Sequence, residues 1–334
     1  MKCHYCERRC DLSDERIGFC RMYSLNEGTI TERFPHRWSS YQVTHIESLP
    51  FFHAYPGART LQVGTAGCNL TCSYCSNAFV ARTDPATVEL FHVSPERLVQ
   101  IAEETGCHTI VFGVNEPTVS VPSLLDLAAQ AHTRGIPIGC LTNGYMTEES
   151  AHTIAEHLSF VNVSLKSLSS AFYQKHAGVE SVDPVLRTIG ILAEHCHVEV
   201  TTPIVQGEND HEIKEIARFI AGIDPSIPWH VFRLLPEHRM AGERAPDIRH
   251  IDALLEPARE MLPYVYFSNF VGSNRLNTVC PACGRTVVER INPGGCGGKI
   301  VRSLLEDGRC PFCGETIPIH GERVMWDSME VDDR

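Results

Sequence analysis

The chain has 334 residues, which is enough for about two domains and a sizeable hydrophobic core. Its 29 lysine and arginine residues stand against 41 aspartate and glutamate residues, a formal net charge of −12. Such an acidic chain is a poor generic ligand for phosphate backbones, so nucleic acid is not an expected partner. No apolar run has the length of a membrane span and the first residues lack an apolar signal core, so we expect no membrane association and a cytoplasmic location.

Cysteine is the unusual component of the composition, with 15 residues. The odd number and the lack of a secretion signal argue against a disulfide framework and for reduced thiolates that bind metal. Four pairs have the C-x2-C spacing, whereas a random arrangement would give about 0.7 such pairs. The cysteines therefore form three groups: one at each end of the chain and one near residue 70.

The first group consists of Cys3, Cys6, Cys10 and Cys20. Four thiols within twenty residues indicate a metal site, but their spacing matches neither a common zinc motif nor the bacterial ferredoxin run. Zinc is the favoured metal at this site, and an auxiliary iron–sulfur cluster is the alternative. We assign residues 1–59 to this cysteine-rich segment and its lead-in.

Residues 60–270 alternate short β-branched or apolar stretches with segments that favour helix. Strands are expected at residues 60–65, 109–113, 138–142, 160–166, 198–205 and 229–235, with a candidate seventh at 264–267. Helix starts are indicated by Ser94 before Pro95, by Thr147 before an acidic turn, by Asp183 before Pro184, and by Asp210 with Glu212 in the first turn. This alternation predicts an α/β fold with a parallel sheet that forms a full or partial barrel.

The first strand leads directly into a loop that contains Cys68, Cys72 and Cys75 in C-x3-C-x2-C spacing. Chance would place such a triplet in this chain only about 0.03 times. Three thiolates in one tight loop suit an iron–sulfur cluster. The next cysteine, Cys107, lies beyond a predicted helix, so we expect one iron to lack a protein thiolate and to be open to a substrate or cofactor. The alternative is a zinc knuckle, or an electron-transfer cluster completed by a distant cysteine.

This loop resembles the signature of the radical S-adenosylmethionine (SAM) superfamily, in which an aromatic residue precedes the last cysteine, as Tyr74 does here. The resemblance implies a partial (β/α)6 TIM-like barrel in which Cys68, Cys72 and Cys75 bind a 4Fe–4S cluster. It also implies that SAM chelates the fourth iron, with Tyr74 near the adenine. In such enzymes the reduced cluster cleaves SAM, and the resulting 5′-deoxyadenosyl radical abstracts a hydrogen atom.

More of the chain resembles the AmmeMemoRadiSam-system radical SAM proteins, which are relatives of pyruvate formate-lyase activating enzyme. The similar stretches are residues 3–20, 46–77, 114–118, 142–145, 165–167, 198–202 and 228–230, together with two C-terminal C-P-x-C-G motifs. The resemblance implies a protein glycine as hydrogen donor, but a peptide or small-molecule substrate stays open because fold analogy cannot choose among them. An electron donor such as flavodoxin or ferredoxin is the expected partner.

The predicted strand ends supply candidate SAM-binding residues. Asn115 and Glu116 end the second strand, where the family binds the amino group of SAM, and a carboxylate suits an ammonium. An ordinary acid at a helix start is the alternative for Glu116. Asn143 follows the third strand, and Ser164 and Lys166 share one face at the end of the fourth. Lys166 would pair with the SAM carboxylate, with a solvated lysine as the alternative, and Ser164 stands where the family commonly has aspartate.

Three other polar residues fall near motifs of the family without carrying a clear signal. His53 and His230 are expected to be structural, as a single histidine most often is. Arg233 on the sixth strand suits anion binding and a structural ion pair equally. None of the three is assigned a catalytic role.

The C-terminal group consists of Cys280, Cys283, Cys310 and Cys313 in two C-P-x-C-G knuckles. Four thiolates would close the coordination shell of a structural zinc ion, so residues 271–334 are predicted to form a zinc-ribbon-like domain. The glycine after each second cysteine lets backbone amides approach the thiolates. Cys296, in the segment between the knuckles, is interpreted as a spare thiol.

The patterns predict a barrel at residues 60–270 between two metal-binding modules, and the resemblance implies that the chain is a radical SAM enzyme. A metal-binding scaffold or a nucleic-acid-binding ribbon protein without catalytic activity is the alternative. The cysteine triplet followed by Asn115 and Glu116 at a strand end favours the enzyme.

Overall fold

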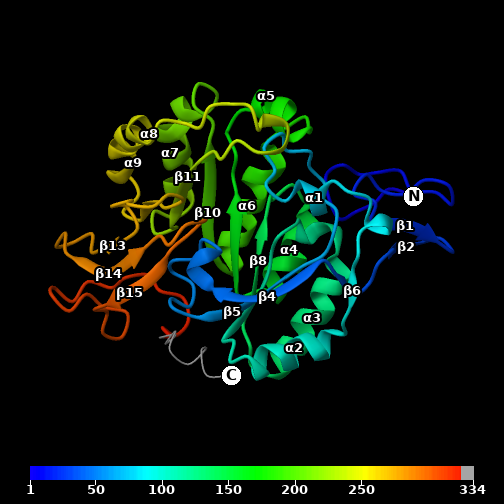
Figure 1. Ribbon diagram of the computed structural model, residues 1–334, viewed down its shortest axis with the longest axis horizontal. Coiled ribbons are helices and arrows are strands. Elements are labelled where there is room, and N and C mark those ends of the chain that lie inside the picture. The colour runs from blue at the N-terminus through cyan, green and yellow to red at the C-terminus, as the bar shows by residue number, and fades with distance from the viewer. Residues whose placement is uncertain (325–334) are drawn as a thin grey trace.

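A computed structural model describes residues 1–324, and its centre is an eight-stranded sheet in the order β12-β11-β10-β9-β8-β7-β5-β4 (Figure 1). Seven strands are parallel, and only the edge strand β4 (Ser40–His45) runs antiparallel, beside β5. The parallel strands are β5 (Arg59–Gly64), β7 (Thr109–Phe112), β8 (Ile138–Thr142), β9 (Phe160–Ser164), β10 (His197–Ile204), β11 (Trp229–Arg233) and β12 (Val265–Phe267). All seven expected strands, including the candidate seventh, are therefore confirmed.

Helices follow the strands in alternation, which confirms the α/β class and the βα repeat. The longer ones are α2 (Pro95–Glu104), α3 (Val121–Thr133), α4 (Glu148–His157), α6 (Asp183–His195), α7 (Ile213–Ile223) and α8 (Ile248–Leu254). Their apolar faces and the sheet form one large buried cluster in which most of the strand residues are β-branched or aromatic. Short turns α1 (Ala78–Ala81), α5 (Ser170–Phe172) and α9 (Glu256–Arg259) complete the helices. None of the helices in residues 1–324 has the length and apolar character that crossing a membrane requires.

Two predicted helix starts are confirmed and two are wrong in detail. The hydroxyl oxygens of Ser94 and Thr147 accept backbone N–H bonds at the starts of α2 and α4. Asp183 is the first residue of α6 and does not cap it, because its carboxylate accepts a bond from Ser181. Asp210 opens the 3-10 turn η5 (Asp210–Glu212) ahead of α7, and its carboxylate contacts His250.

Three small sheets lie outside the barrel. The hairpin β1 (Tyr23–Asn26) and β2 (Thr29–Glu32) follows the N-terminal cysteines, and β3 (Arg37–Trp38) pairs with β6 (Phe91–His92). Strands β13 (Thr278–Val279), β14 (Thr286–Ile291) and β15 (Lys299–Ser303) form an antiparallel sheet near the C-terminus. Figure 1 shows the N-terminal coil and the β13–β15 sheet on opposite sides of the barrel. The predicted domain boundaries, one between residues 59 and 60 and one between residues 270 and 271, stay a prediction.

A buried carboxylate organises the end of the sheet where the parallel strands begin. Glu199, near the start of β10, is fully buried and accepts the backbone N–H groups of residues 52–54. It also lies 2.6 Å from His230 and 3.2 Å from His197. Although burial alone would raise it, the bonds from these two histidines hold the pKa of Glu199 well below its usual range.

We expect Glu199→Ala to lower the free energy of unfolding by about 3–5 kcal/mol, because it leaves three buried N–H groups without an acceptor. Denaturant unfolding followed by circular dichroism measures this loss. Glu194→Ala on the exposed face of α6 is the control and should change stability by less than about 0.5 kcal/mol. Equal stability of the two variants would contradict the structural role of Glu199.

Candidate active site

The cysteine loop leaves β5 at the end of the sheet where the parallel strands finish, and the side chain of Asn115 holds it there. The Asn115 amide accepts the N–H of Thr65 at 2.8 Å and donates to the carbonyl oxygens of Ala66 and Gly67 at 3.0 Å. These buried backbone groups receive their hydrogen-bond partners from Asn115, which lies 48 to 50 residues away in the sequence. Asn115 thus positions the loop, a role that the sequence reading did not predict.

Cys68, Cys72 and Cys75, hereafter the cysteine triplet, are free half-buried thiols. The Cys68 sulfur accepts the N–H of Leu70 at 3.4 Å and the Asn143 side-chain amide at 3.7 Å. Burial and the nearby Glu116 carboxylate raise the pKa of Cys68. A thiolate at this position therefore needs a positive partner such as a metal centre.

Cys107 is placed where it cannot complete the triplet. It precedes β7 and lies beside Thr105, whose carbonyl oxygen accepts a bond from Arg59 at the start of β5. The triplet follows the opposite end of β5, after Gly64. Cys107 is thus separated from the triplet by the length of a strand, in agreement with the expected open position.

Glu116 links the ends of β7 and β8. Its carboxylate accepts bonds from the N–H of Asn143 at 2.7 Å, from Thr142 Oγ1 at 2.8 Å and from Thr118. Burial raises its pKa, while these bonds act in the opposite direction. Its expected role toward the amino group of SAM stays a prediction, because the carboxylate is already engaged within the chain.

Lys166 is a nearly buried cation at the end of β9, with only 7% of its surface exposed. Its Nζ donates to Ser164 Oγ at 3.0 Å, which confirms that the two side chains share a face. No carboxylate of residues 1–324 forms a salt bridge with Lys166. Asn209 fixes the Lys166 backbone by donating to its carbonyl oxygen at 2.6 Å. A buried ammonium without an anion is suited to an anionic ligand.

Other polar groups at this end of the sheet also lack partners. The buried Tyr74 hydroxyl and the Arg233 Nε have no hydrogen-bond partner among the described residues. In contrast, His53 and His230 lie at the opposite end, where they contact Tyr266 and Glu199. This placement agrees with the structural role expected of both histidines.

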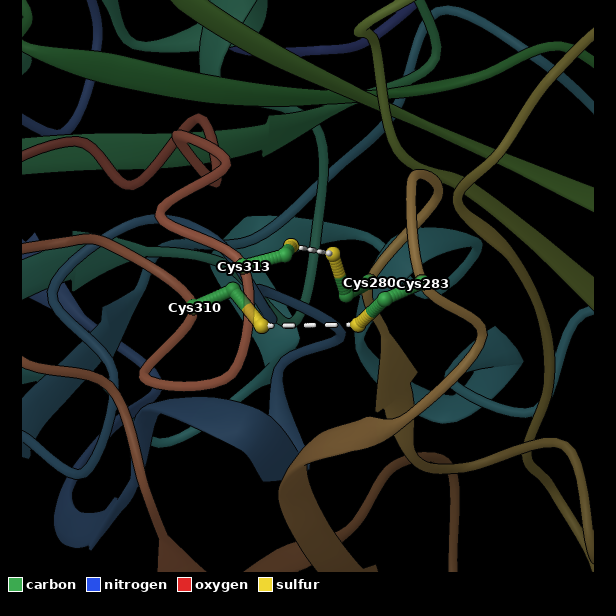
Figure 2. A group of neighbouring side chains, drawn as sticks. All are labelled: Cys280, Cys283, Cys310 and Cys313. Atoms are coloured by element: carbon green, nitrogen blue, oxygen red, sulfur yellow. Dashed lines mark hydrogen bonds between the residues drawn. The ribbon is translucent and has the colours of Figure 1, made fainter.

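The C-terminal cysteines form a compact metal-binding group (Figure 2). Among residues 1–324, Cys280, Cys283, Cys310 and Cys313 bring their ligand atoms within 4.8 Å of one another. The sulfur atoms of Cys280 and Cys313 are 3.6 Å apart, and those of Cys283 and Cys310 are 3.7 Å apart. Tetrahedral zinc with Zn–S bonds of about 2.3 Å separates its sulfurs by about 3.8 Å. The geometry thus fits a single ion bound by four thiolates, whose identity as zinc stays a proposal.

The two knuckles of this group have the same backbone geometry. Gly284 and Gly314 adopt φ angles of 71° and 79°. Each donates its N–H to the backbone carbonyl oxygen of the first cysteine of its knuckle at 2.9 Å. Although desolvation alone would raise it, backbone N–H groups lower the pKa of Cys310 to about 7. The group packs near Phe52, Tyr264 and Tyr266, away from the cysteine triplet.

Cys3, Cys6, Cys10 and Cys20, hereafter the N-terminal cysteine set, pack against the loop of the triplet. Residue 6 forms a β-bridge with Met146, which follows β8. Arg8 donates to the carbonyl oxygens of Asn69, inside the triplet loop, and Gly178. The sequence reading identified the cysteines but missed Arg8 and Asn69; the position of Asn69 between two triplet cysteines was the available signal.

The comparisons with known proteins agree with this geometry. Residues 63–220 match the model of the radical SAM superfamily. An uncharacterized protein of Methanocaldococcus jannaschii is 28% identical over 96% of this chain and 95% of its own length. A probable GTP 3′,8-cyclase of Thermococcus kodakarensis is 30% identical over 47% of this chain, which spans 51% of that protein.

Two further similarities concern an activating enzyme and a solved structure. The isethionate sulfite-lyase activating enzyme of Desulfovibrio desulfuricans is 27% identical over 54% of this chain and 58% of its own length. The structure of Streptococcus suis SuiB bound to S-adenosylmethionine has a TM-score of 0.51 at 16% identity, and the similarity covers 64% of this chain and 51% of that one. The latter shows the fold alone: a partial barrel of the kind expected. The match to the radical SAM superfamily of enzymes covers residues 63–220, the part of the chain that carries the cysteine triplet at the carboxyl end of the first parallel strand.

Proposed function

We propose that the protein uses a 4Fe–4S cluster at the cysteine triplet to cleave SAM reductively and to abstract a hydrogen atom from a substrate. The observation that carries this proposal is the grouping of three free thiols with a buried, anion-free lysine at one end of the sheet. Strand ends at this face of a barrel are where catalytic groups gather.

The triplet has the donor set that an iron–sulfur cluster with an open iron requires. It offers three thiolates and no fourth cysteine on the same loop. When bound, the cluster supplies the single electron that breaks the sulfonium C–S bond of SAM. The Leu70 backbone N–H and the Asn143 side-chain amide donate to the Cys68 sulfur and stabilise negative charge on it. They would therefore make the reduction potential of a bound cluster less negative.

The surrounding residues have the chemistry to orient SAM. Lys166 supplies a cation for the carboxylate, and Ser164 holds its ammonium from the neighbouring position. The Tyr74 hydroxyl is free to bond a polar group near the adenine. Asn143 and Glu116 join two strand ends, so they keep the amino-group side of the site rigid.

For the substrate we propose a protein or peptide, supported by the similarity to an activating enzyme. Small molecules stay an alternative because the fold hosts several chemistries. The electron donor is a low-potential protein of the flavodoxin or ferredoxin class. We also propose a cytoplasmic location, since all fifteen cysteines are free thiols and thiolate ligands need a reducing compartment. Anaerobic capture of binding proteins from the native cell, followed by a radical-transfer assay on each, tests the substrate class.

We expect Cys72→Ala to abolish reductive cleavage of SAM while metal at both terminal cysteine groups persists. Two remaining thiolates cannot hold the cluster firmly, whereas the terminal groups have their own four cysteines each. Anaerobic assay of 5′-deoxyadenosine with dithionite as reductant, paired with metal analysis, measures both. Formation of 5′-deoxyadenosine at the wild-type rate would refute the assignment of the triplet.

The Lys166→Met variant should bind SAM about 10- to 100-fold more weakly, since it removes one charge-assisted bond to the SAM carboxylate. Its iron content should match that of the wild type, because Lys166 donates to Ser164 rather than to a cysteine. Titration of the reduced-cluster EPR signal with SAM gives the affinity. Lys214→Met, on the exposed side of α7, is the matched control and should leave affinity unchanged; equal affinity of both variants would sink the role of Lys166.

For the C-terminal group, Cys313→Ser should reduce zinc by about one atom per chain and loosen residues 271–324, because such modules fold largely through metal binding. The barrel has its own hydrophobic core, so SAM cleavage without substrate should survive. Metal analysis and hydrogen exchange measure the two effects. Unchanged zinc, or loss of iron together with the ribbon, would show that these cysteines bind a different metal.

A further inference from the structure

We propose that the N-terminal cysteine set holds a second iron–sulfur cluster, which serves as the electron-entry site for the cluster at the triplet. The inference rests on the proposed function of the triplet. It replaces the preference for zinc that the N-terminal spacing alone suggested.

The spacing of the thiols separates the two kinds of cysteine group in this chain. The C-terminal group is compact enough for a single ion, with sulfur pairs 3.6 and 3.7 Å apart. Among residues 1–324, this is the only group of three or more such ligand atoms that lie close enough together to hold a single ion. A wider arrangement suits a cluster, because each thiolate then binds a different iron atom. The N-terminal set thus resembles the triplet and differs from the zinc-like group.

The backbone of the N-terminal set also packs closely against the triplet loop. A side chain at Gly67, the residue before Cys68, would stand 2.7 Å from the carbonyl oxygen of Cys20. Gly67 has a φ angle of 78°, so the position favours glycine on both counts. The chain at Cys20 therefore lies directly on the start of the triplet loop.

One buried residue of the triplet loop links the N-terminal segment to Cys68. Asn69 lies between Cys68 and Cys72 in the triplet loop and is fully buried. Its Oδ1 is 3.8 Å from the Cys68 sulfur. Its carbonyl oxygen accepts a bond from Arg8, two residues after Cys6. Asn69 thus contacts both the N-terminal segment and Cys68.

A cation lies between the two groups as well. Arg8, between Cys6 and Cys10 in the sequence, donates to the carbonyl oxygens of Asn69 in the triplet loop and of Gly178. Arginine stays protonated under these conditions. A guanidinium shared by two thiolate sites stabilises the added electron on either of them. In contrast, a structural zinc ion carries no electron, and nothing in its role requires this proximity.

The electron count of the proposed step is balanced. A flavodoxin- or ferredoxin-class donor gives one electron to the N-terminal cluster and is itself oxidised by one electron. The N-terminal cluster returns to its oxidised state when it passes that electron to the triplet cluster. No proton is transferred between the two clusters, and no bond is formed or broken.

The first test uses the unmodified, anaerobically purified protein and needs no variant. Metal analysis should give about eight iron atoms per chain, four for each cluster. Full reduction should give two EPR signals, of which SAM alters only one. If the protein cleaves SAM with dithionite but holds about four iron atoms and zinc at the N-terminal set, this inference is wrong while the proposed function stands.

The second test separates entry of electrons from catalysis. Cys10→Ser should lose about four iron atoms and the EPR signal that SAM does not alter. Its rate of SAM cleavage should fall at least about tenfold with reduced flavodoxin but stay within about twofold of wild type with dithionite. Cys296→Ser, the same change at an exposed cysteine, is the control and should alter neither metal content nor rate.

The outcomes distinguish the two proposals. Equal flavodoxin-dependent rates in Cys10→Ser and the wild type would overturn the electron-entry role. A wild-type protein that fails to cleave SAM with dithionite would overturn the proposed function itself. Loss of both EPR signals in Cys10→Ser, together with loss of dithionite-driven cleavage, would show that the N-terminal set supports the triplet structurally and would overturn its role as electron-entry site.

Discussion

The hydrogen bonds of a single buried amide, Asn115, set the geometry on which the active end of the barrel depends. This side chain satisfies three backbone groups of the loop that leaves β5, so the loop cannot move without leaving them unpaired. The next residue, Glu116, joins β7 to β8 through Asn143, and Asn143 in turn donates to Cys68. Consecutive strand ends are thus connected to one cysteine by one continuous network.

The network explains how chemically unlike groups are held together without a shared segment of chain. The parallel sheet brings the ends of β5, β7, β8 and β9 to the same edge, although they are separated by about 100 residues in sequence. Hydrogen bonds then fix side chains from each strand end relative to the next. Lys166 stands apart, because its charge is only partly satisfied by Ser164.

Much of this arrangement follows from local patterns in the sequence. Short β-branched runs predicted the seven parallel strands, and the side-chain caps of Ser94 and Thr147 predicted two helix starts. These signals are local, since each depends on residues within a few positions of one another. The cysteine triplet was recognisable for the same reason.

The remaining features depend on partners that are distant in sequence. Asp210 does not cap α7 because its carboxylate contacts His250, forty residues away. Glu199 was not singled out in the sequence, yet it accepts bonds from a segment about 147 residues earlier. Likewise, the role of the Asn115 amide in holding the loop was not predicted, because its partners lie about 50 residues away in sequence. No local pattern reports such contacts, because tertiary packing alone determines them.

The close approach of Cys20 to Gly67 also determines how the chain can be divided. A fragment that began at residue 60 would keep every parallel strand but would lose the donors from Arg8 to Asn69 and Gly178. It would also uncover the surface that Met22 and Tyr23 bury against the barrel. The barrel is therefore not a self-sufficient catalytic unit that can be excised or transplanted by its strands alone, and any fusion or chimera built on it has to carry the first thirty or so residues with it.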